Sequence, residues 1–306
     1  YGAAAVLLLL LTLLSSCGQS AVPDETATDY NQYIPSHGVT AYTKDLYIFF
    51  DSGRLFYVGR SQPSQLFPLC FQADCDHKNS SCTAWLNTPS RSIYAAGDNL
   101  YYIDADKDAK PALYRMDLSG GGRELVKSLN ILNEESWPGI SSLGYSFRVY
   151  GSYLAIELNL LQEDSWQHKI YLTGIDSKDE GVFLFGEEGD SDKSYIAIEF
   201  RENWLFVTEK NAADGTNTLW GYNFTTQEAV PLVEGWDISN CFTVQDGILY
   251  WAVTGDGVYS MDMEKKSVTK HRSFDPVSEY GAAAYDDQYL YLTNAIRYMD
   301  SQGTVP

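Results

Sequence analysis

From about residue 38 onward, short apolar runs alternate with polar residues, and turn sequences separate the runs. The stretch DLYIFF-DSG-RLFYVG at residues 45–59 shows this pattern clearly. Alternation with a period of two puts the apolar side chains on one face of an extended strand and cannot form the stripe of an amphipathic helix. Turn sequences such as Asp-Ser-Gly and Gly-Asp-Gly supply the positive φ angles that tight hairpins need. The pattern therefore predicts a series of β-hairpins, with no helix after the amino-terminal segment.

Six such hairpin units follow one another along the chain. One leucine recurs in each unit, at intervals of 54, 54, 51, 44 and 41 residues: Leu46, Leu100, Leu154, Leu205, Leu249 and Leu290. Further apolar runs between the hairpins predict additional strands at 124–129, 144–149, 182–185, 195–200 and 241–245. Four strands per unit, at a period of about 40–50 residues, are typical of a β-propeller. We expect an all-β protein, a β-propeller of six blades with four antiparallel strands each; seven blades are the alternative.

Two of the units carry a resemblance to a known family. NLYYIDA with ALYRMDLSGG, and ILYWAVTGDGVYSMD, resemble the blades of the TolB-like six-bladed β-propeller domain of uncharacterised bacterial lipoproteins. The resemblance covers residues 38–306. It implies an architecture but no activity, because propellers carry enzymes, binding proteins and scaffolds alike. A last outer strand should begin near SQGTVP, so either an amino-terminal strand closes the ring or the domain is truncated at the C-terminus.

The first residues resemble an export signal. Residues 3–14 form an apolar run without a charge, too short to span a bilayer as a helix but typical of a signal-peptide core. Leu14-Ser15-Ser16-Cys17 then resembles the bacterial lipobox, whose cysteine receives a diacylglycerol after the preceding peptide is removed. An ordinary cleaved signal with an incidental cysteine is the alternative.

This segment sets the expected domain organisation and location. We expect a lipoprotein signal peptide at 1–16, lipidation at Cys17, a polar tether at 17–37 and the propeller at 38–306. The chain begins at Tyr1 without a methionine or basic residues, which we interpret as a clipped gene product. The expected location is the bacterial cell membrane, where the protein is lipid-anchored and faces the outside.

The net charge limits the classes of partner that the protein can bind. The chain has 21 Lys and Arg residues against 41 Asp and Glu residues, and a net charge of −20. A field of this sign repels phosphate backbones and anionic headgroups. We therefore exclude nucleic acid as a partner, and we expect membrane contact through the amino-terminal lipid alone.

The chain has only five cysteines, and three of them lie close together with a histidine. Cys70, Cys75, His77 and Cys82 fall within the stretch LCFQADCDHKNSSC. Three thiolates and one imidazole complete a tetrahedral shell of the kind that holds structural zinc. The spacing is not that of a zinc finger. Similar segments recur in the lipoprotein propellers that the chain resembles, which adds modest weight to a metal site without deciding between the interpretations.

Disulfide bonds are the competing interpretation of this segment, and free thiols are the third. An exported chain meets oxidising chemistry, and Cys241 brings the cysteines after Cys17 to four, enough for two bridges. In each case we expect a structural staple, because a closed four-ligand shell leaves no position for a catalytic water.

Three other carboxylates suggest a calcium loop but do not complete one. Asp104, Asp106 and Asp108 have the opening spacing, yet Ala109 stands where glycine is needed and Arg115 where the closing glutamate belongs. We interpret this stretch as a solvated hairpin loop.

The sequence favours a non-catalytic function and assigns no catalytic residue. We expect a binding or scaffolding module at the bacterial cell envelope, with a protein, peptide or glycan as its ligand. The alternative is an extracellular carbohydrate-active hydrolase or lyase, which needs two carboxyl groups about 5–9 Å apart at the central channel. A third possibility, a module of a larger envelope complex, would show a broad apolar patch. A channel lined by tyrosine and amide groups would favour the binding module.

Overall fold

The computed structural model describes residues 40–86, 92–162, 165–178, 180–186, 192–235, 242–253, 256–273, 283–285, 289–292 and 297–300. Within these ranges the chain forms β-strands and two short 3₁₀ helices. Neither of these helices is long and apolar enough to cross a lipid bilayer.

Strands that are consecutive in sequence pair into antiparallel sheets, five of four strands and one of three. The first sheet contains β1 (Thr40–Tyr42), β2 (Leu46–Asp51), β3 (Arg54–Gly59) and β4 (Gln62–Pro68). The second contains β5 (Ile93–Ala96), β6 (Asn99–Ala105), β7 (Pro111–Asp117) and β8 (Glu124–Ser128). The third contains β9 (Ile140–Tyr150), β10 (Tyr153–Gln162), β11 (Ser165–Gly174) and β12 (Val182–Phe185).

The remaining three sheets continue the same order. The fourth contains β13 (Lys193–Arg201), β14 (Trp204–Asn211), β15 (Asn217–Asn223) and β16 (Glu228–Glu234). The fifth contains β17 (Phe242–Gln245), β18 (Ile248–Val253), β19 (Gly257–Asp262) and β20 (Ser267–Ser273). The sixth contains β21 (Ala283–Tyr285), β22 (Tyr289–Leu292) and β23 (Arg297–Asp300).

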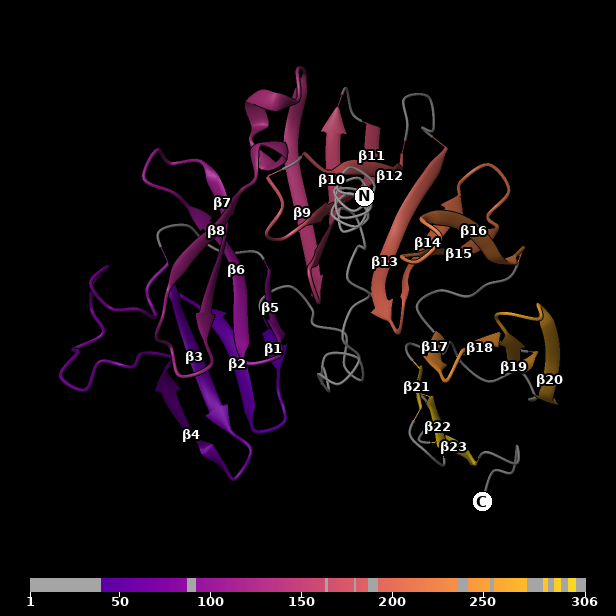
Figure 1. The fold of residues 1–306 in the computed structure, drawn as a ribbon, viewed down its shortest axis with the longest axis horizontal. Helices are drawn as coiled ribbons and strands as arrows, with labels where there is room; N and C mark the ends of the chain where they lie inside the picture. The colour runs from indigo at the N-terminus through magenta and orange to yellow at the C-terminus, as the bar shows by residue number, and fades with distance from the viewer. Residues whose placement is uncertain are drawn as a thin grey trace, which may run out of the picture.

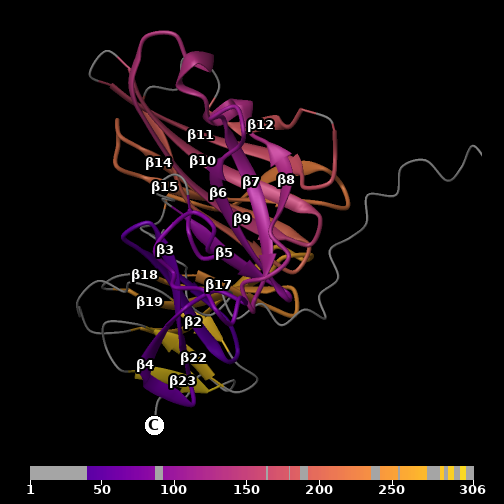
Figure 2. The ribbon, with the colours of Figure 1, turned by 90° about the vertical axis from the view of Figure 1, so that its left-hand side faces the viewer.

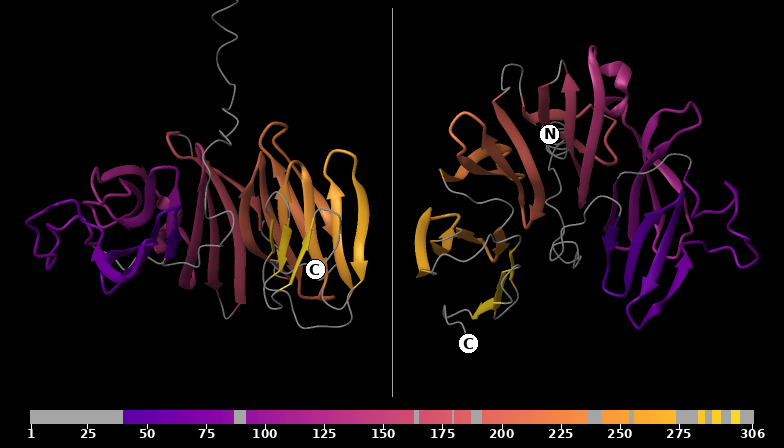
Figure 3. Two further views of the ribbon diagram at one scale, coloured as in Figure 1. Left: turned by 90° about the horizontal axis from the view of Figure 1, so that it is seen from below. Right: turned by 180° about the vertical axis from the view of Figure 1, so that it is seen from behind.

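The sheets follow one another around an arc, with the first and the sixth at its two ends (Figure 1). Views from the side, from below and from behind show the same succession of sheets (Figures 2 and 3). The first strands of neighbouring sheets contact one another, as in β1 with β5, β5 with β9 and β9 with β13. Each repeated leucine lies on the second strand of its sheet. The all-β fold of propeller blades is therefore confirmed.

Apolar side chains fill the space between successive sheets. Along β6, Leu100 and Tyr102 face the cluster shared with the first sheet, whereas Tyr101 and Ile103 face the cluster shared with the third. Similar clusters join the third sheet to the fourth and the fourth to the fifth. Both faces of an inner strand are thus buried, which explains why NLYYIDA reads as a nearly continuous apolar run.

The two 3₁₀ helices were not predicted. The helices η2 (Asn130–Leu132) and η3 (Glu134–Ser136) lie in the connection from β8 to β9. The Asn133 side chain accepts a hydrogen bond of 3.3 Å from the Glu135 N–H and so starts the second of them. Such one-turn helices depend on local side-chain bonds and are too short to show a hydrophobic period.

Candidate metal centre

The segment that carries the cysteine cluster connects β4 to β5 and folds back against the β2–β3 turn. The Leu55 N–H donates to the Ala84 carbonyl at 2.8 Å, and the Leu86 N–H donates to the Gly53 carbonyl at 3.0 Å. Trp85 also forms an isolated antiparallel bridge with Arg54. The connector is therefore held along the edge of the first hairpin by backbone hydrogen bonds.

The fold brings all four predicted ligands together. The ligand atoms of Cys70, Cys75, His77 and Cys82 all lie within 4.8 Å of one another. The distance from His77 Nδ1 to Cys82 Sγ is 3.4 Å, and the His77 N–H donates to Cys75 Sγ at 3.4 Å. These three cysteines form no disulfide bond. The arrangement can hold one ion among three sulfur atoms and one nitrogen atom.

Local hydrogen bonds produce the curl of the loop. The Asp76 carboxylate accepts the Lys78 N–H at 3.2 Å, and the Asn79 side chain accepts the Ser81 N–H at 3.0 Å. Such side-chain bonds to the backbone two residues on stabilise tight turns. The loop therefore folds back within a few residues and directs the side chains of Cys75 and Cys82 toward the same point.

His77 occupies a conformation that few residues adopt. Its φ is 56°, in the left-handed region, which histidine enters more readily than most non-glycine residues. Arg54 Nη1 donates to the His77 carbonyl at 3.1 Å and holds this peptide in place. The left-handed turn brings the imidazole beside the Cys82 thiol.

The cluster is anchored in the apolar core. Cys82 is only 1% exposed, and Cys70 and Cys75 pack against the cluster of side chains between the first and second sheets. Burial raises the pKa of Cys82 to about 12. Burial also acts to raise the pKa of Cys70, but hydrogen bonds that involve Thr83 and Gln72 outweigh it and lower the pKa to about 6.

Two further features were considered in the sequence: the cysteines outside the cluster and the aspartates that resemble the start of a calcium loop. Cys17 and Cys241 lie outside the described residues, so lipidation and any bridge to Cys241 stay predictions. Asp106 shapes a hairpin loop, since its carboxylate accepts the backbone N–H groups of Asp108 and Lys110 at 2.8 and 2.9 Å. The loop at 106–110 matches the solvated hairpin loop that we expected, but the expectation is wrong for Asp104, which lies on β6 and is only 1% exposed.

Sequence reasoning missed the ion pair between Asp104 and Arg123. The Asp104 side chain is fully buried, and its Oδ2 lies 2.5 Å from Arg123 Nη2. Arg123 Nη1 also donates to the Trp85 carbonyl at 3.1 Å, and its Cζ lies 4.9 Å from the centre of the Tyr114 ring. Arg123 thereby fastens the second sheet to the connector that carries the candidate centre. The available signal was a lone aspartate at the end of an otherwise apolar run.

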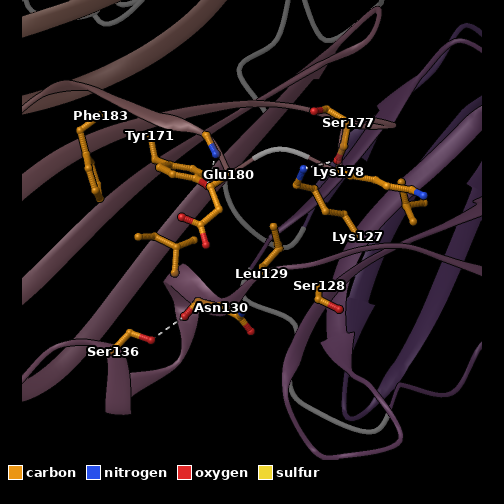
Figure 4. Close-up of a pocket in the computed structure, with 13 residues that line it drawn as sticks. Lys127, Ser128, Leu129, Asn130, Ser136, Tyr171, Ser177, Lys178, Glu180 and Phe183 are labelled. Carbon is orange, nitrogen blue, oxygen red and sulfur yellow. Dashed lines mark hydrogen bonds between the residues drawn. The ribbon is translucent and has the colours of Figure 1, made fainter.

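A separate cleft lies between the second and third sheets. It has a volume of about 610 Å³ and is bordered by β8, η2, the end of β11, the following loop and β12. Figure 4 shows the rings of Tyr171 and Phe183 on one side and the lysine side chains at the other end. Lys127 Nζ donates to the carbonyls of Gly174 and Ser177 at 3.1 and 2.6 Å and so ties the two walls together. No sequence motif predicted this cleft, because its walls come from different blades.

Comparison with known proteins identifies the architecture only. No protein-family model matches the chain, and a search of curated proteins gives no match. Among solved structures, the oligogalacturonate lyase from Vibrio parahaemolyticus is similar at a TM-score of 0.51 and 10% identity, over 81% of this chain and 71% of that one. A puromycin-hydrolyzing peptidase of Mycobacterium tuberculosis has a TM-score of 0.51 and 13% identity, over 89% of this chain and 44% of that one. A chain of the nidogen/laminin complex has a TM-score of 0.45 and 15% identity, over 85% and 91%. The likeness to the lyase and to the peptidase supports a six-bladed propeller fold.

Proposed function

We propose that this chain is a non-catalytic binding module, held outside a bacterial cell membrane by a lipid on Cys17, that binds a glycan or peptide. The finer assignment, to the TolB-like propellers of bacterial lipoproteins, is part of this proposal. It is supported by the blade sequences at 99–105, 112–121 and 248–262 and by the lipobox-like residues 14–17. The cleft between the second and third sheets is the observation that carries the binding function.

The cleft has the size and chemistry of a ligand site. Its volume of about 610 Å³ falls in the range of about 300–1,000 Å³ that is common for small-ligand pockets. Phe183 is 43% exposed and offers an aromatic surface on which a sugar ring or an apolar side chain can stack. Asn130, Ser128 and Lys178 add hydrogen-bond donors and acceptors around the ring.

The same cleft favours binding over glycoside cleavage. Glu180 is the one carboxylate among its described lining residues. General acid and base catalysis of glycoside hydrolysis needs two carboxyl groups about 5–9 Å apart. A wall of tyrosine, amide and hydroxyl groups with a single carboxylate is suited to holding a ligand. A hydrolase or lyase that acts at the central channel is therefore the second outcome of the test below.

The test is a binding screen of the full chain in detergent against arrays of envelope oligosaccharides and peptides, followed by calorimetry. We expect Phe183→Ala to weaken the ligand found in this way by about tenfold, since the loss of one stacked ring costs about 1.4 kcal/mol. Trp166→Ala is the matched control: Trp166 is an exposed aromatic residue of the same sheet, and it does not line the cleft.

Two results would contradict the proposal. Equal loss of affinity in Phe183→Ala and Trp166→Ala would show that the ligand does not bind in the cleft. Release of new reducing ends or of unsaturated sugars from an oligosaccharide would show that the chain is an enzyme.

A further inference from the structure

We propose that Cys70, Cys75, His77 and Cys82 together bind a single Zn²⁺ ion, which fastens the connector between β4 and β5 to the first and second sheets. This inference concerns the stability of the fold and is independent of the ligand-binding function.

The distances fit one tetrahedral ion. Zinc–sulfur bonds of about 2.3 Å and zinc–nitrogen bonds of about 2.0–2.1 Å place neighbouring ligand atoms of a tetrahedron about 3.6–3.8 Å apart. The pair His77 Nδ1 and Cys82 Sγ stands at 3.4 Å, and every other pair lies within 4.8 Å. Small side-chain rotations are enough to close this set around an ion.

A disulfide explains less of the arrangement. One bridge joins two sulfur atoms at about 2.05 Å and gives no reason for a third thiol and an imidazole to meet them. Here all four side chains converge, from positions spread over a thirteen-residue loop. Convergence of three thiols and one imidazole is what a shared ligand requires.

The backbone of His77 supports the same conclusion. Its φ of 56° lies in the left-handed region, as it does at six other described non-glycine residues, and Arg54 Nη1 holds the His77 carbonyl at 3.1 Å. This turn places the imidazole Nδ1 beside Cys82 Sγ and so completes the set of four.

The ligand types select the metal. Calcium and magnesium prefer oxygen ligands, whereas thiolates with imidazole favour zinc. Four protein ligands fill a tetrahedral shell and leave no position for a reacting water, so the role is structural. An open hollow bordered by Asp74, Cys75 and Asp76 reaches the cluster, which provides a route of entry with negative charge on its walls.

The centre is positioned to join two sheets. The turn after β7 packs on the connector so closely that a Cβ on Gly120 would stand 2.4 Å from the Leu69 carbonyl oxygen. From the other side, Arg123 binds the Trp85 carbonyl. An ion between Cys70 and Cys82 would therefore fix the segment that lies between these two contacts.

The experiment is metal analysis and thiol titration of the full chain, purified in detergent without added metal or reductant. We expect about one zinc per chain and three cluster thiols that react only after chelation. Cys75→Ser should lose most of the zinc. His77→Cys rebuilds a shell of four sulfur atoms and should keep it, whereas His77→Ala should not. Cys241→Ser is the matched control and should retain the zinc of the parent.

A measurement on the parent chain covers the case in which the variants do not fold. Replacement of zinc by Co²⁺ should give the intense visible bands of tetrahedral cobalt bound to thiolates, and added Zn²⁺ should abolish them. Three results would overturn the proposal: a mass that is two hydrogens light for each disulfide bridge, reduced thiols that take up no added Zn²⁺, or the weak spectrum of octahedral cobalt.

Discussion

At the scale of single residues, a buried charge stands out from the apolar core. Asp104 is 1% exposed on the inner strand β6, and Arg123, which directly precedes β8 of the same sheet, supplies its cation. Removal of one partner of a buried pair is costly because the other charge stays buried without its counter-ion. Arg123 also contacts Trp85 and Tyr114, so its loss affects the packing of the connector as well.

Arg123→Met should therefore lower the free energy of unfolding by about 3–5 kcal/mol, as measured by urea denaturation. Arg115→Met is the matched control, because Arg115 pairs with the exposed Glu124 in the same sheet and should cost less than about 1 kcal/mol. Addition of Asp104→Leu to Arg123→Met should restore part of the loss. Equal losses of unfolding free energy in Arg123→Met and Arg115→Met would show that the buried ion pair stabilises the fold no more than the exposed one.

A histidine of the third sheet makes stability depend on pH. Burial lowers the pKa of His168 below its usual 6.5, and its Nδ1 lies 2.5 Å from Asn159 Oδ1. Below pH 6.5 the histidine takes up a proton in the unfolded chain more readily than in the folded chain. The contribution of His168 to the free energy of unfolding is therefore fully present above pH 6.5 and is lost as the pH falls below that value.

His168→Gln should reduce this loss between about pH 7.5 and pH 5.5, as followed by urea denaturation at each pH. Part of the dependence of the free energy of unfolding on pH should remain, because burial also lowers the pKa of His271. A variant with the same slope as the parent would show that His168 does not titrate differently in the folded state.

At the scale of elements, the turn from β7 to β8 requires glycine at one position. Gly120 has a φ of +85°, and a Cβ there would also meet Cys70 N at 2.9 Å. Backbone atoms cannot move aside as a flexible side chain can. The turn and the connector are therefore fitted to each other without room for a methyl group.

Gly120→Ala should cost about 2–4 kcal/mol, from backbone strain and from overlap with the connector. Gly97→Ala, in the first turn of the same sheet, is the matched control. Its φ is +56° and nothing lies within 4 Å of the added Cβ, so about 1 kcal/mol is expected. Thermal unfolding of both variants would decide; equal costs would mean that the close approach to Leu69 relaxes freely.

At the scale of the whole molecule, the core clusters of the described residues join sheets that are neighbours in sequence. Separate core clusters join the first sheet to the second, the second to the third, and so on to the fifth. Energetic coupling in such an array falls off with the number of interfaces crossed. A local change at the connector should therefore stay local.

Removal of the proposed zinc by a chelator should raise amide hydrogen exchange in the connector and in the first and second sheets. Exchange in the fourth and fifth sheets, at 193–234 and 242–273, should stay within error of the metal-loaded protein. A uniform rise across all sheets would indicate that the ion stabilises the fold as one cooperative unit.

The proposed lipid on Cys17 gives a prediction for the protein in its cell. Cys17→Ala should move the protein from the membrane fraction to the soluble extracytoplasmic fraction and stop incorporation of labelled palmitate. If the Cys17→Ala variant stays in the membrane fraction and the parent protein incorporates no labelled palmitate, the protein is attached by something other than a lipid on Cys17.

Much of the architecture was predictable because it rests on local patterns. A period of two in the apolar residues and the hairpin turns between them are properties of a few consecutive residues, and the six leucines all lie on the second strand of a sheet. The four candidate ligands were also recognised in sequence because they lie on one loop. Whether they bind zinc stays a prediction.

The sequence by itself determined the strands, their order and the set of residues that can reach a metal, because hydrogen bonds between neighbouring strands and a short loop restrict the chain locally. Only the tertiary structure decided that Arg123 meets Asp104 and Trp85, that the Gly120 turn closes on the connector, and that the second and third sheets enclose a cleft. These features arise where separate strands, turns and sheets are stacked against one another. No spacing along the chain encodes such contacts, because they depend on how the packed apolar faces align the sheets.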